Sequence, residues 1–189
     1  MSTTHTIEYE TEVDALASAD EFVIHDASAV AAKKCEASKV RAFVGSGAVD
    51  ATAATLAVTQ ATHGGQTISM NRAAGITATL PAATGTGAVF RFVVTTTVTS
   101  NSNIIQVANA TDEFVGIVYQ VDADTGDALV AYPALDADGF DTITMDGSTT
   151  GGIQGDIYTI IDIATGKFQL IGHQTGTGTV ATPLSAAVA

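Results

Sequence analysis

Along most of this chain, apolar residues alternate with polar ones or form short runs, and Gly- or Asp-rich segments separate the runs. Alternation with a period of two indicates strands that bury one face. From residue 55 onward the pattern predicts short strands at 55–59, 67–71, 77–80, 89–98, 104–107, 114–121, 128–132, 142–145, 157–162 and 168–174. Short strands at such regular spacing are typical of an all-β fold, here a β-sandwich or jelly-roll-like body.

Two stretches, Phe90–Val94 and Ile157–Ile161, are apolar at nearly every position. We therefore expect these two to be the central strands of the core. The Thr165-Gly166 pair within residues 156–172 predicts a β-hairpin. No repeat period of a solenoid is found.

The N-terminal segment has a pattern of its own. It predicts a strand at 21–25, a turn after Asp26 and a returning strand at 30–35, with two helical turns over 37–43. Residues 45–50, which include Gly45 and Gly47, are interpreted as a linker.

Two regions follow from this pattern. Residues 1–45 are expected to form a small hairpin-helix module, and residues 46–189 a β body. An extended tail occupies about 175–189, because its small residues give it no reason to fold alone.

Composition favours the same fold class and excludes several functions. Aromatic residues are 6% of the chain, Trp is absent, and the formal net charge is −13, from 20 acidic and 7 basic residues. Such acidity argues against binding nucleic acid or an anionic membrane surface. The single Cys35 excludes an intrachain disulfide. No secretory signal or membrane span is expected, which predicts assembly in a cytoplasm.

The charge is unevenly distributed. Four of the seven bases lie within residues 33–41, whereas residues 92–166 contain no Lys or Arg. This predicts an electrostatic contact through the N-terminal module, although a solvated hairpin and helix face has the same pattern.

Catalytic motifs are lacking. There is no phosphate-binding glycine loop, HExxH or G-x-S-x-G pattern, and the four histidines are scattered. A glycoside hydrolase is disfavoured because exposed aromatic residues for stacking on sugar are scarce. We therefore expect no enzymatic activity and no cofactor.

Two loops rich in Asp could bind Ca²⁺, since alternate carboxylates beside Gly can converge in a tight turn. Their carboxylates are Asp122, Asp124, Asp127, Asp136, Asp138 and Asp141. Neither loop completes an EF-hand, and turn chemistry between strands explains the same residues.

Several stretches of this chain resemble structural proteins of tailed-bacteriophage particles. Residues 16–26 (LASADEFVIHD), with Lys33-Lys34 and the segment 38–43, resemble a short module near the start of tail-fibre, appendage and head-decoration proteins. Residues 75–92, which contain LPAATGTGAVFRF, resemble a stretch of phage structural proteins. The segments 151–156, 162–168 and 176–183 fit the same class.

This resemblance implies a virion protein on the capsid exterior. The chain is compact and lacks the shaft of a long fibre, so it is most similar to a head decoration, or cement, protein that binds the major capsid protein. Such proteins are commonly trimers or dimers, and a trimer is expected here. The alternative is a tail-fibre or adaptor component that contacts the host surface. Candidate contact residues are Phe22, Lys33, Lys34, Lys39, Val40 and Arg41.

Overall fold

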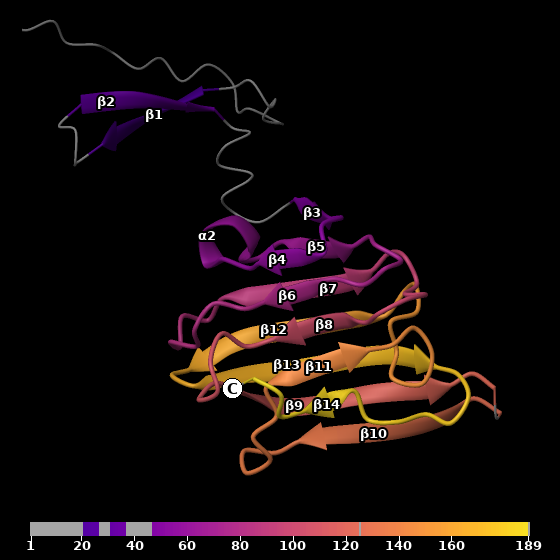
Figure 1. Cartoon of the computed structure of the whole chain (residues 1–189). Helices are drawn as coiled ribbons and strands as arrows, with labels where there is room; N and C mark the ends of the chain where they lie inside the picture. The colour runs from indigo at the N-terminus through magenta and orange to yellow at the C-terminus, as the bar shows by residue number, and fades with distance from the viewer. Residues whose placement is uncertain (1–20, 27–30, 37–46, 125, 189) are drawn as a thin grey trace, which may run out of the picture. The chain divides into compact units, whose positions relative to one another are not determined.

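The computed structural model describes residues 21–26, 31–36, 47–124 and 126–188, with side chains from residue 47 onward. The chain divides into two compact units, Met1–Val44 and Gly45–Ala189. The second unit, called the body below, is a nearly all-β sandwich of two mixed sheets (Figure 1). Of the two body architectures expected, the sandwich describes it.

In the N-terminal unit, strands β1 (Glu21–Asp26) and β2 (Ala31–Glu36) form an antiparallel pair. Phe22 pairs with Cys35, and Lys33 pairs with Ile24. The two strands expected from the sequence are therefore present. The predicted helical turns, with the candidates Lys39, Val40 and Arg41, lie outside the described residues.

The larger sheet has seven strands in the order β10-β9-β13-β12-β7-β5-β3. Their bounds are β3 Ala48–Ala51, β5 Thr67–Met70, β7 Val89–Val94, β9 Glu113–Asp122, β10 Ala128–Ala134, β12 Ile157–Ala164 and β13 Lys167–Gly176. Strands β12 and β7 lie inside this sheet, as the apolar runs predicted. Strands β12 and β13 form the expected hairpin.

The smaller sheet has five strands in the order β14-β11-β8-β6-β4. Their bounds are β4 Thr55–Ala57, β6 Thr77–Thr79, β8 Asn103–Gln106, β11 Thr142–Met145 and β14 Leu184–Ser185. The body also contains one short helix, α2 (Gln60–His63), among its described residues; the side chain of Thr59 caps it by accepting from the Thr62 N–H.

From β3 to β8 the chain winds between the sheets in coils. Strands β3, β5 and β7 pair in parallel in one sheet, and β4, β6 and β8 pair in parallel in the other. Successive pairings join Ala48 to Thr67 and then Thr67 to Arg91, so the coils differ in length. Because the coils have no constant length, no repeat period marks this arrangement in the sequence.

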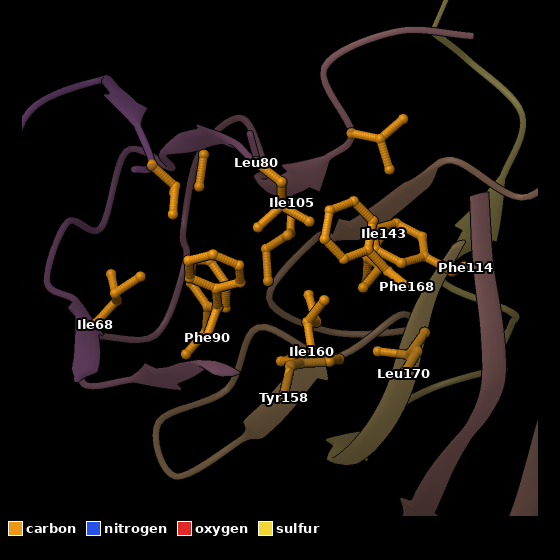
Figure 2. Packing of buried hydrophobic residues seen from close by; sticks show 14 of the residues in the cluster. Ile68, Leu80, Phe90, Ile105, Phe114, Ile143, Tyr158, Ile160, Phe168 and Leu170 are labelled. Atoms are coloured by element: carbon orange, nitrogen blue, oxygen red, sulfur yellow. The ribbon is translucent and has the colours of Figure 1, made fainter. Parts of the chain in front are cut away.

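The core lies between the two sheets. The largest fully buried side chains include Phe90, Phe92 and Phe168 from the seven-stranded sheet and Ile143 from the five-stranded sheet. Figure 2 shows these layers meeting around Phe114 and Phe168, whose ring centroids are 6.3 Å apart. Burial of this aliphatic and aromatic surface is the main source of stability.

At the two ends of the body, the structure differs in detail from the sequence-based interpretation. The linker assigned to 45–50 overlaps strand β3, which pairs with β5 and forms one edge of the seven-stranded sheet. The tail assigned to about 175–189 is part of the body, since β13 continues to Gly176 and β14 pairs with β11. Leu184 is buried, and its apolar side chain gives the tail a reason to fold once β11 is in place.

Candidate interaction surface

The seven-stranded sheet carries aliphatic residues on the side that faces away from the core. Even-numbered residues of β9, β12 and β13 point inward, so the odd-numbered ones face outward. We call the following residues the apolar face: Val115, Ile117, Tyr119, Val121, Ile157, Ile161, Ile163 and Ile171. Ile163, Ile157 and Ile171 are 49%, 40% and 37% exposed.

The strand register places these aliphatic residues in adjacent rows, with Thr159, Gln169 and His173 between them. Ile171 pairs with Ile117 on one side and Thr159 on the other. In the adjacent row, Tyr119, His173 and Ile157 are paired across β9, β13 and β12. Cross-strand neighbours lie about 5 Å apart, so these side chains form one surface.

The outer face of the five-stranded sheet has a different composition. Thr144, Ile104, Thr77 and Thr55 form one row across β11, β8, β6 and β4. Apart from Ile104, this row consists of Thr, which suits a solvated sheet face. The outer face of the seven-stranded sheet is therefore more apolar than this row on the outer face of the five-stranded sheet.

The sequence pattern of β12 bears on what the apolar face does. Its run Ile157–Ile161 has the near-continuous apolar character of a strand covered on both sides. Within the body only one side of β12 is covered, because Tyr158 and Ile160 are fully buried while Ile157 and Ile163 are exposed. The second side therefore has the character of an interface.

Charged groups on this sheet are few. Arg91, on β7 beside Thr159, is exposed and makes no ion pair with any described residue. At one end of the sheet, Lys167 pairs with Glu113 and Asp136. His173 stacks on Tyr119 with ring centroids 5.9 Å apart. Apart from Glu113, the outward residues of β9, β12 and β13 include no carboxylate.

The edge of the sheet at β10 also exposes apolar residues. Leu129 on β10 and Leu135 just after it are 66% and 59% exposed. Pro133 lies in β10, a position that suits an edge strand because Pro cannot donate to a further strand.

Five of the six aspartates considered for Ca²⁺ accept hydrogen bonds or form an ion pair within the body, and Asp127 does neither with any described residue. Asp122 accepts from the Asp124 N–H, and Asp124 accepts from the Gly178 N–H at 2.6 Å. Asp138 accepts from the Leu135 N–H, and Asp136 pairs with Lys167.

Asp141 has a further role in holding the C-terminus. Its carboxylate accepts from the N–H groups of Ala187 and Val188, at 2.7 and 3.1 Å. Across the part of the chain that the structure describes, no group of three or more His, Cys, Asp or Glu side chains is placed to hold a metal ion.

The stretch that resembles phage proteins around Thr84–Thr86 forms a loop around the Asp162 carboxylate. The N–H groups of Thr84, Gly85 and Thr86 donate to it at 3.0, 2.7 and 3.0 Å. Burial raises the pKa of Asp162, but the hydrogen bonds from Thr86, Gly85 and Thr84 outweigh it, so the pKa lies below its usual range. The residues of this motif therefore fix a loop.

A second polar cluster lies at the opposite end of β12. Asp156 is buried and accepts from the N–H groups of Gly152, Ile153 and Thr175. Burial raises its pKa to about 6, although these hydrogen bonds act to lower it. The neighbouring Tyr158 hydroxyl donates to Gln174.

His63, His173 and Ser69 each have a partner within the body, and the Thr59 hydroxyl lies 3.5 Å from His63 Nδ1. His63 bonds to the Thr59 N–H that precedes helix α2, and His173 stacks on Tyr119. The Ser69 hydroxyl bonds to Thr95. Each of these groups has a structural partner.

Sequence reasoning did not identify the apolar face as a site. The signal was present in the run Ile157–Ile161, which was interpreted only as core. The predicted contact residues Phe22, Lys33 and Lys34 lie on the β1–β2 hairpin.

No protein-family model matches the chain, and a search of curated protein sequences found no match. No helix of the described residues is long and apolar enough to cross a membrane.

Proposed function

We propose that this chain is a structural protein of a tailed-bacteriophage particle, without catalytic activity, which decorates the capsid exterior and stabilises the shell of major capsid protein. The observation that carries the proposal is the resemblance of residues 16–26 and 75–92 to virion structural proteins.

A scaffold role for the second stretch is consistent with this proposal. Thr84–Thr86 are bound by Asp162, which begins another of the resembling segments. Two stretches with the character of virion proteins thus stabilise each other in the folded body. A structural protein of a particle needs a rigid subunit, and it does not need a reactive site.

The proposed contact with the shell uses the basic cluster at residues 33–41, which lies in the N-terminal unit. Lys33 and Lys34 belong to this cluster, which holds four of the seven bases, whereas the rest of the N-terminal unit and the body are acidic. A capsid surface rich in carboxylates would therefore attract this cluster. Repetition over many sites gives avidity beyond any one contact. The protein is also proposed to act as a homo-oligomer, with a trimer favoured by the resemblance.

Copy number in purified particles tests the proposal. Quantitative mass spectrometry of the particles should give this chain in a fixed, high ratio to the major capsid protein. A few copies per particle would favour the tail-fibre or adaptor alternative. Absence from purified particles would refute a virion role.

A variant separates shell binding from folding. Lys33→Glu with Lys34→Glu in the full chain should lower the amount bound to particles, while Thr55→Glu on the five-stranded sheet should not. If both variants bind to particles equally well, the N-terminal unit does not form the proposed contact.

A further inference from the structure

We propose that the apolar face binds a second copy of this chain, with the β10 edge of one copy lying across the apolar face of the next. This deepens the homo-oligomer part of the proposed function and stands without the virion part.

The apolar face requires a partner that brings apolar side chains and one carboxylate. Its Ile and Val side chains lose contact with water only when another apolar surface covers them. Arg91 lies next to them and has no anionic partner among the described residues. A buried guanidinium without a partner is strongly unfavourable, so the covering surface must supply an acid.

The β10 edge of the same chain supplies both. Leu129 has the largest exposed fraction of the large hydrophobic residues of the body. Asp127, two residues earlier, is exposed and has a positive φ of 56° in the turn between β9 and β10. Its carboxylate makes no hydrogen bond or ion pair within the described residues.

The spacing on the face matches a short edge segment. In one row, only Thr159 separates Arg91 from Ile171. Neighbouring strands lie about 4.8 Å apart, so the two positions are roughly 10 Å apart. An arginine side chain covers much of that span, so Leu129 can lie on Ile171 while Asp127 meets the guanidinium.

Leu129 pairs with Val121 on β9, so its side chain projects from the same side of the sheet as the apolar face. When two copies meet through this side, Leu129 and Asp127 of one copy lie against Ile171 and Arg91 of the other. The exposed acids elsewhere on this chain would repel another copy, whereas the apolar face would not.

Sedimentation of the full-length chain and of charge-reversed variants tests the inference. The wild type should associate in a concentration-dependent way, and Arg91→Glu and Asp127→Lys should each weaken association by at least about tenfold. The double variant with both substitutions should recover it, because the reversed charges again meet across the contact. Thr55→Glu is the control for added negative charge. Leu129→Ser, at an exposed edge position, tests the apolar half without introducing charge.

Circular dichroism melts identify variants that fail to fold. If Arg91→Glu does not fold, Asp127→Lys and Leu129→Ser decide the matter. A wild type that stays a single chain at every concentration overturns the inference. The inference is also overturned if Asp127→Lys and Leu129→Ser both associate as strongly as the wild type. It is likewise overturned if the double variant folds but does not regain association. Absence of the protein from phage particles would sink the proposed function and leave this result unaffected.

Discussion

Gly85 donates its backbone N–H to the carboxylate of Asp162 at 2.7 Å, although the two residues are far apart in the sequence. The carboxylate also accepts from Thr84 and Thr86. One aspartate on β12 therefore holds the loop that leads into β7, the neighbouring strand of the sheet. Charge-assisted bonds of this kind are stronger than those between neutral groups.

Removal of this carboxylate should destabilise the body. Asp162→Ala leaves three backbone N–H groups without their acceptor, and the expected loss is on the order of 3 kcal/mol in the free energy of unfolding. Chemical denaturation measures it, and hydrogen exchange should accelerate at Thr84, Gly85 and Thr86. Asp50→Ala, which loses one exposed bond to Asn71, is the matched control. Equal stability of the two variants would contradict this role.

Local pattern was sufficient to predict most strands of the body, because alternation and Gly- or Asp-rich turns are properties of adjacent residues. Strand β12 and its hairpin with β13 are examples. The pattern missed β14, since the two residues of this strand become buried only against β11.

Long-range partners could not be predicted in this way. Nothing near Asp162 in the sequence indicates that residues 84–86 donate to it, and Asp141 meets Ala187 because β11 pairs with β14. The apolar face was missed for a related reason. A run such as Ile157–Ile161 indicates two covered sides, but the sequence does not say whether the second cover comes from the same chain.

Stability should fall as the pH rises through the titration of Asp156. The folded-state pKa, about 6, lies above the ordinary value of 3.8, so the folded state holds the proton more tightly. This contribution is fully present below about pH 4 and is lost as the pH rises through about 6, with a total on the order of 3 kcal/mol.

Denaturation of wild type and Asp156→Asn between pH 4 and pH 8 measures this linkage. The difference in unfolding free energy between the two proteins should change across that range, because Asn carries no proton to lose. Asp50→Asn, at an exposed site, should retain the wild-type slope. Parallel curves for wild type and Asp156→Asn would contradict the assignment to Asp156.

The C-terminal end should be released by a change at Asp141. Asp141→Ala removes the acceptor of the Ala187 and Val188 N–H groups, so carboxypeptidase should digest the variant faster than the wild type. Asp138→Ala, which loses only the bond to the Leu135 N–H, should be digested at the wild-type rate. Equal rates for Asp141→Ala and the wild type would show that β14 alone holds the end.

Chelation should leave the fold unchanged. Asp124, Asp138 and Asp141 accept hydrogen bonds from backbone N–H groups, and Asp136 is paired with Lys167. We expect the same melting temperature with EDTA and with added Ca²⁺. A melting temperature that rises with Ca²⁺ and falls again with EDTA would show that these loops bind Ca²⁺.

We infer that this protein acts through a surface, and that the apolar face is covered in the assembled state. Thiol labelling at single introduced cysteines, in a Cys35→Ser background, tests it most directly. With the assembled protein, Ile171→Cys should be protected and Thr77→Cys, on the outer face of the five-stranded sheet, should react. Dilution to single chains should make both react. Rapid labelling of Ile171→Cys in the assembled protein would contradict the account.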